Sequence, residues 1–194
     1  MGKKTHKLHS SMGCCNIDTY FLVEKSIFPL LMTHFYRKVP PNPKWPDKYD
    51  RVVVLVRDPF DALLAEFNRK HTKNHTGFAS DEKFETEWLP YVTNSIEFWR
   101  GFHVYFKNQY EPHKVLFTKF ENFHENLIGE LQRVLHFLGF HMSEQIQKCV
   151  ENRKEGLFHR KKVEIDQIKY YNAEQKIVLK TVRDEIYKKI GLNK

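Results

Sequence analysis

The stretch from Arg51 to Lys70 reads RVVVLVRDPFDALLAEFNRK, and it determines the fold that we expect. Residues 52–56 are a short apolar, mostly β-branched run, which is typical of a strand buried on both faces in a parallel sheet. Asp58 can cap a following helix, and Pro59 suits its first turn. Apolar side chains then recur three and four residues apart, at Phe60, Leu63, Leu64 and Phe67. The stretch therefore predicts a strand, a tight turn and a helix.

Arg57 stands at the junction of this strand and helix. Ligands of open α/β sheets bind at the carboxyl ends of the strands, and a helix N-terminus attracts phosphate. We therefore take Arg57 as a candidate anion-binding residue. The alternative is a surface ion pair with Asp61 or Glu66, since structural ion pairs are common.

A second strand is predicted at 114–119, KVLFTK. The helix after it has one apolar face and ends at Gly139; its apolar positions are Leu127, Leu131, Leu135 and Leu138. Between the strands, 71–81 is polar and predicts a loop. A strand, helix, strand, helix order requires crossover connections. The sequence thus predicts an α/β fold with a parallel sheet flanked by helices.

Three further helices are expected. The first begins near Pro90 and carries an aromatic stripe with Trp88 and Trp99, which we interpret as core rather than as a sugar-binding surface. A short helix follows at 143–151. The last helix is capped by Asn172 and has an apolar face made of Leu179, Val182, Ile186 and Ile190.

Length and charge limit the possible classes of protein. The 194 residues are 41% hydrophobic, which suits one domain, residues 1–194, with a substantial core. The net charge of +8 favours an anionic partner. Acidic residues are interspersed and no long Lys/Arg block occurs, so we expect no nucleic acid partner, although a basic nucleic-acid-binding protein is the rival class. No apolar run approaches the roughly 20 residues of a membrane-spanning helix.

Two features concern the cellular compartment. Cys14, Cys15 and Cys149 lack the spacing of zinc ligands. A disulfide bond between Cys149 and one of the two adjacent cysteines is an alternative that the sequence does not decide. Asn74-His75-Thr76 is a glycosylation sequon, which would matter only in the secretory lumen.

The order RDPxDxxxAxxxR, beginning at Arg57, resembles the 3′-phosphate-binding segment of sulfotransferases that use 3′-phosphoadenosine 5′-phosphosulfate (PAPS). The resemblance implies that Arg57 holds the 3′-phosphate of the nucleotide. The family's Ser eight residues later is Ala65 here. The chain is most similar to the C-terminal sulfotransferase domain of WSC-domain-containing proteins, and the similarity runs through residues 63–79, 119–121, 137–139, 149–151 and 154–156.

Lys3 to His9, KKTHKLH, resembles the family's KTH motif. The resemblance implies that Lys4 is the cation near the bridging oxygen and that His6 is the base that accepts the proton of the acceptor hydroxyl. A histidine with a pKa near 6.5 suits that task at neutral pH. The alternative is a frayed basic N-terminus.

Residues 153–162, RKEGLFHRKK, are a second basic site. Gly156 permits a loop in which Lys154, Arg160 and Lys161 could converge on an anion. The segment resembles the late Arg/Lys-Gly segment that closes over the nucleotide in sulfotransferases. A solvated basic loop is the alternative.

The resemblance implies a P-loop-NTPase-like sulfotransferase fold. The family's phosphosulfate-binding loop, upstream of the KTH motif, is missing, so we expect an N-terminally truncated domain. The expected function is transfer of a sulfuryl group from PAPS to a hydroxyl of a glycan or glycoprotein, such as a sialylated one. The expected location is the Golgi, with membrane attachment only through upstream sequence. We expect no metal in the reaction. The alternative is an inactive remnant that binds nucleotide or anionic glycan.

Overall fold

The computed structural model describes residues 49–74, 76–152 and 167–192. In these residues two strands, β1 (Val52–Val56) and β2 (Val115–Lys119), pair in parallel, with the first residues of the two strands opposite each other. Both strands match the sequence-based expectation. The α/β class with a parallel sheet is therefore confirmed.

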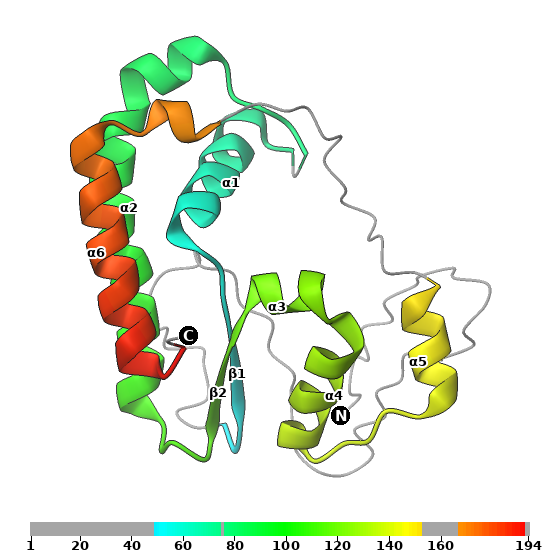
Figure 1. The fold of residues 1–194 in the computed structure, drawn as a ribbon. Helices are drawn as coiled ribbons and strands as arrows, with labels where there is room; N and C mark the ends of the chain where they lie inside the picture. Colours follow the sequence, from blue (N-terminus) through cyan, green and yellow to red (C-terminus); the bar gives the residue numbers. More distant parts are fainter. Residues whose placement is uncertain (1–48, 75, 153–166, 193–194) are drawn as a thin grey trace, which may run out of the picture.

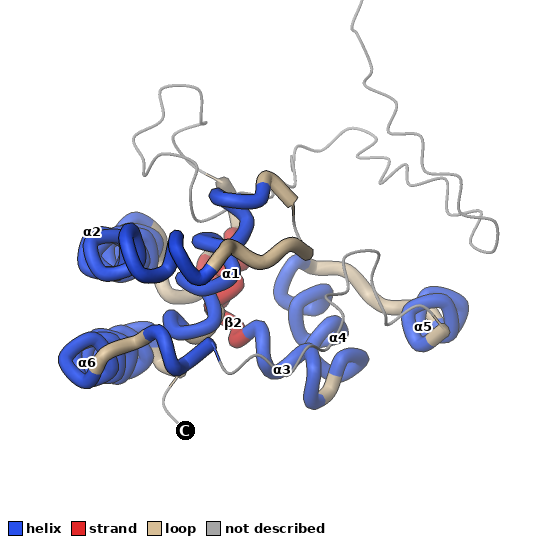
Figure 2. Tube along the Cα trace, turned by 90° about the horizontal axis from the view of Figure 1, so that it is seen from above, coloured by secondary structure: helices blue, strands red, loops and turns tan. Residues whose placement is uncertain are grey.

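Helices lie on both sides of these strands. Seen from above in Figure 2, α2 (Asp81–Gln109) and α6 (Ala173–Ile190) lie on one side, and α3 (Phe120–Glu125) and α4 (Leu127–Leu138) on the other. In Figure 1, α1 (Pro59–Thr72) continues upward from the carboxyl end of β1. The carboxyl ends of both strands thus meet at the foot of α1.

The strands bury one face more completely than the other. Val54 and Val56 of β1, with Val115 and Phe117 of β2, belong to the core shared with α2 and α6. Leu55, on the opposite face, is 50% exposed. The expectation that β1 is buried on both faces is therefore wrong, because the helices on that side do not cover Leu55.

Helix α1 follows the predicted pattern. Its buried side chains include Leu63, Leu64 and Phe67, and Asp58 caps it by accepting a hydrogen bond from the Phe60 amide at 2.9 Å. The helix continues to Thr72, one residue past the start of the predicted loop at 71. The described residues of the observed loop are 73–74 and 76–80.

Helix α2 begins at Asp81, nine residues before the predicted start. Pro90 lies inside the helix, although an internal proline removes a backbone hydrogen bond and costs about 3 kcal/mol. Phe84 and Trp88, on the N-terminal side of Pro90, are 5% and 2% exposed. Burial of these aromatic side chains explains why the helix extends through the proline.

The interpretation of the aromatic stripe as core is confirmed. Trp99 is 1% exposed, and Trp88 packs against Phe67 of α1 with ring centroids 4.9 Å apart. His103 is also buried, and its Nδ1 lies 2.6 Å from the carbonyl oxygen of Trp99. Burial lowers the pKa of His103 to about 4, so this histidine is neutral and structural.

Helix α6 runs parallel to α2. Asn172 and Gln175 form a capping box at its start, and its buried apolar face is the predicted one. The 3₁₀ turn η1 (Gln167–Tyr170) precedes it, and Tyr170 stacks on Phe84 with ring centroids 3.8 Å apart. Further along, Tyr187 of α6 faces Trp99 of α2 at 6.5 Å. The two helices therefore pack along most of their length.

The predicted helix after β2 is divided in two at Asn126, whose side chain caps α4 by accepting from the Gly129 amide at 3.0 Å. Gly139 ends α4 in a left-handed conformation with φ of 87°. Helix α5 (Glu144–Glu151) follows, capped by Ser143. None of the helices within the described ranges is long and apolar enough to cross a membrane.

Glu130 fastens α4 to β2. Its carboxylate accepts hydrogen bonds from the hydroxyl of Thr118, which is fully buried, and from the guanidinium of Arg133. The hydrogen bond from Arg133, with that from Thr118, lowers the pKa of Glu130 below its ordinary value of 4.5. A group with a lowered pKa stabilises the fold above its unfolded pKa, and this stabilisation is lost as the pH falls through the folded pKa.

We predict that Glu130→Gln lowers the free energy of unfolding by about 1 to 2 kcal/mol at neutral pH, since hydrogen bonds to a charged group are replaced by weaker ones. The difference from wild type should shrink below the ordinary glutamate pKa, where Glu130 itself becomes neutral. Urea denaturation across acidic and neutral pH measures this. Glu125→Gln, which removes an exposed carboxylate of α3, is the control; an equal and pH-independent loss in both variants would contradict the role of Glu130.

Candidate functional site

The peptide between Arg57 and Asp58, where β1 meets α1, is held by two other elements. Trp99 of α2 donates its Nε1–H to the carbonyl oxygen of Arg57 at 3.2 Å. The Asp58 amide donates to Oε1 of Glu121, at the start of α3, at 3.1 Å. The backbone that carries the Arg57 side chain is therefore fixed from both sides of the sheet.

The Arg57 side chain makes no ion pair within the described residues. Its Nε is buried and has no hydrogen-bond partner, and its guanidinium carbon lies 5.1 Å from the centroid of the Phe120 ring. Glu66, one of the alternative partners, pairs with Arg69 instead. A buried donor without an acceptor costs free energy, and an anion bound here would supply that acceptor.

The start of α1 is capped as predicted. Asp58 occupies it with its own carboxylate, whose other oxygen, Oδ2, lies 3.2 Å from the guanidinium of Arg183 on α6. Burial raises the pKa of Asp58 even though Arg183 and the Phe60 amide oppose the shift. A phosphate here would meet the carboxylate at the helix N-terminus, so its binding falls to the Arg57 side chain rather than to the amides of α1.

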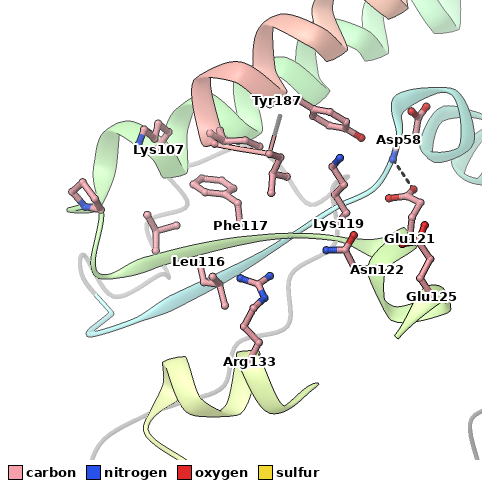
Figure 3. A pocket seen from close by; sticks show the side chains of 15 residues that line it. Asp58, Lys107, Leu116, Phe117, Lys119, Glu121, Asn122, Glu125, Arg133 and Tyr187 are labelled. Carbon is pink, nitrogen blue, oxygen red and sulfur yellow. Dashed lines mark hydrogen bonds between the residues drawn. The ribbon is translucent and has the colours of Figure 1, made fainter. Parts of the chain in front are cut away.

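A cavity of about 840 Å³ lies along β2, between α6 and the α3–α4 pair (Figure 3). Its lining includes three cationic and three acidic side chains: Lys107, Lys119, Arg133, Asp58, Glu121 and Glu125. Such a balanced set does not by itself favour an anion. Arg57 is not part of this lining, so the cavity and the candidate anion site are neighbours joined through Asp58.

At the upper end of the cavity in Figure 3, Lys119 and Tyr187 approach each other. The Lys119 ammonium lies 4.8 Å from the centroid of the Tyr187 ring, a cation–π contact. Burial, with the carboxylates of Asp58 and Glu121, raises the pKa of Tyr187. The phenol therefore stays protonated and remains a hydrogen-bond donor at neutral pH.

The structure places Arg57 at the predicted position, but five other candidates lie outside the described residues: Lys4, His6, Lys154, Gly156 and Arg160. Ala65, which replaces the family's serine, is partly buried on α1. Within the described ranges no cluster of histidine, cysteine or carboxylate side chains could hold a metal ion.

Sequence reasoning did not identify Trp99, Glu121 and Arg183 as residues that position Arg57 and Asp58. Trp99 belongs to the core stripe. Glu121 lies two residues after the end of the second strand, so its place near the strand end was a usable signal. Arg183 lies 125 residues from Asp58 in the sequence, and no local pattern marks that pairing.

The sulfotransferase domain model matches residues 4–180 of the chain. The chain belongs to the sulfotransferase family. The match includes both strands and the Arg57 junction, so this sulfotransferase carries its candidate anion site where ligands of α/β sheets bind.

Relatives support the narrower similarity to WSC-domain-containing proteins. The chain is 33% identical to a WSCD family member of Aedes aegypti over 148 residues, which are 74% of this chain and 45% of that protein. It is 34% identical to a WSCD family member of Drosophila melanogaster over 119 residues, 59% of this chain and 37% of that protein. The chain spans less than half the length of these curated relatives. No solved structure matches it significantly.

We predict that Arg183→Met destabilises the sulfotransferase by about 1 to 2 kcal/mol at neutral pH, because it leaves the partly buried Asp58 carboxylate without its cation. Arg183 stabilises only the charged form of Asp58. The loss should therefore shrink as the pH falls through the raised pKa of Asp58. Denaturation curves recorded across this pH range test the prediction.

Arg100→Met is the matched control for this substitution, since Arg100 makes exposed ion pairs with Glu97 and Glu185. Exposed pairs contribute little, so its effect should be below about 1 kcal/mol. In Asp58→Asn protein, Arg183→Met should cost less than in wild type. Full additivity of these two substitutions would reject the coupling.

Proposed function

We propose that the chain transfers a sulfuryl group from PAPS to a hydroxyl group of a glycan, and that Arg57 binds the 3′-phosphate of the nucleotide. The observation that carries the proposal is the Arg57 guanidinium. It lies at the carboxyl end of β1 on a fixed backbone, and its buried Nε has no acceptor in the described residues.

The surroundings of Arg57 suit a phosphate. The Phe120 ring covers the guanidinium, and a partly desolvated arginine binds phosphate through strong, charge-assisted hydrogen bonds. No described carboxylate forms an ion pair with Arg57. Binding a phosphate would therefore satisfy the buried donor without first breaking an ion pair.

In this proposal Lys4 and His6 carry out the transfer step, because the segment that contains them resembles the KTH motif. PAPS supplies the sulfuryl group. The acceptor oxygen forms a bond to sulfur, the bond between sulfur and the bridging phosphate oxygen breaks, and the acceptor proton passes to His6. Lys4 stabilises the negative charge that grows on the phosphate of the departing adenosine 3′,5′-bisphosphate. No step requires a metal ion.

The segment with Lys154, Gly156 and Arg160 is proposed to close over the same 3′-phosphate as Arg57. The net charge of +8 supports anionic ligands, including a sialylated glycan or glycoprotein acceptor. Similarity to the WSC-domain-containing group supports a location in the Golgi lumen, with membrane attachment through sequence upstream of the domain.

A second candidate function is nucleotide or glycan binding without turnover. Ala65 favours it, because the hydroxyl that the family places at this position is absent. The two functions differ in turnover, not in nucleotide binding, so both quantities must be measured.

We predict that Arg57→Ala weakens binding of adenosine 3′,5′-bisphosphate roughly tenfold or more, the expected cost of losing charge-assisted hydrogen bonds. Arg57→Lys should recover only part of the affinity, since it keeps the charge but not the planar fork. Titration calorimetry measures both. Arg100→Ala, which removes an exposed arginine of α2, is the control, and equal affinities of wild type and Arg57→Ala would reject the assignment.

We predict that His6→Ala lowers the transfer rate by about 10² to 10⁴ and leaves nucleotide affinity unchanged, because a general base acts on the acceptor and not on the donor's binding. Transfer of radiolabelled sulfate to sialylated and neutral glycans measures the rate. Nucleotide binding by wild type without any transfer would favour the second candidate function. Unchanged turnover in the variant would remove His6 from the mechanism.

A further inference from the structure

Residues 73–74 and 76–80, between α1 and α2, lie in a loop, and the sequence Asn74-His75-Thr76 is a sequon. This is the sole Asn-x-Ser/Thr tripeptide with x other than Pro in the 194 residues. His75 lies outside the described residues. The loop is anchored at its base, where the fully buried Asn68 accepts a hydrogen bond from the Ala79 amide at 2.8 Å. Asn74 and Thr76 therefore belong to a loop that is anchored to α1.

Asn74 is exposed, and its side chain uses only its carbonyl oxygen for hydrogen bonds. Oδ1 accepts from the amide of Thr76 at 3.0 Å and from the Thr76 hydroxyl at 3.2 Å. The side-chain nitrogen Nδ2 makes no hydrogen bond to the described residues. A sugar attached to Nδ2 would therefore break none of these bonds, since a glycosylated asparagine keeps its carbonyl oxygen.

The sequon is remote from the candidate anion site. Helix α1 has 14 residues and separates Asn74 from Arg57, which at 1.5 Å per residue is roughly 20 Å. Figure 1 shows α1 leading away from the carboxyl ends of the strands. A glycan on Asn74 would thus leave the access to Arg57 open.

A second, independent observation concerns the compartment. Cys149 of α5 is disulfide-bonded. Disulfides persist in oxidising compartments and are rare in the cytosol. The secretory lumen is oxidising and is also where asparagine is glycosylated. The disulfide and the exposed sequon therefore point to the same place.

We propose that Asn74 is an N-glycosylation site of this protein, modified in the secretory lumen. The donor class is a lipid-linked oligosaccharide diphosphate. The bond from the first sugar's anomeric carbon to the diphosphate oxygen breaks, a bond from that carbon to Nδ2 of Asn74 forms, the diphosphate lipid leaves and the amide releases one proton. The proposal rests on the lumenal location and not on sulfuryl transfer.

The test is expression of the whole chain behind a cleavable secretory signal in animal cells. Protease protection in microsomes establishes that the chain has entered the lumen. The lumenal wild type should run faster on a gel after treatment with an N-glycosidase, and peptide mass spectrometry in heavy-oxygen water should find labelled aspartate at position 74. Asn74→Gln and Thr76→Ala should lose the shift, whereas Thr76→Ser, which keeps the hydroxyl, should retain it.

Release of the glycan without prior denaturation tests the exposure of Asn74 in the folded protein. Native release together with unchanged affinity for adenosine 3′,5′-bisphosphate is the expected result. A protected, lumenal wild type without a glycan, or a glycan that persists in Asn74→Gln, would overturn the proposal. Absence of sulfuryl transfer would leave it standing, so the two proposals fail separately.

Discussion

The joint between β1 and α1 is the constraint on which the described structure depends. Three elements that follow it in the chain converge there: α2 through Trp99, α3 through Glu121 and α6 through Arg183. Each contacts either the backbone of Arg57 and Asp58 or the Asp58 carboxylate. The fold thus fixes this one peptide in place, which is the preorganisation that the proposed anion site needs.

The Arg57 side chain contrasts with its well-bonded backbone. Selection for stability alone would supply an acceptor for a buried guanidinium nitrogen, because an unsatisfied donor costs about 1 to 3 kcal/mol. Local departures from good bonding are expected at functional sites rather than in the scaffold. The neighbouring Asp58, by comparison, is satisfied by a helix amide and by Arg183. Trp88, Glu121 and Gln175 also have buried polar atoms without a partner among the described residues, so the proposed role of Arg57 rests on its charge and its place at the strand end as well.

Aromatic side chains buried between α1, α2 and α6 stabilise the helices that contact the junction of β1 and α1. Phe67 contacts Phe84, Trp88 and Tyr91, with ring centroids 4.7 to 5.1 Å apart. Large aromatic side chains each bury extensive apolar surface, so this cluster keeps α2 packed on α1 on both sides of Pro90. The same packing places Arg183 of α6 beside Asp58.

The sequence by itself determined both strands, the N-caps of α1 and α6, the end of α4 at Gly139, the apolar faces of α1 and α6, and the position of Arg57. These features depend on residues a few positions apart, which is why local patterns predict them. Only the tertiary structure decided that α2 continues through Pro90, that Leu55 is exposed, and that Arg183 pairs with Asp58. Those outcomes depend on packing and charge pairing between segments far apart in the chain, where long-range burial outweighs local preference.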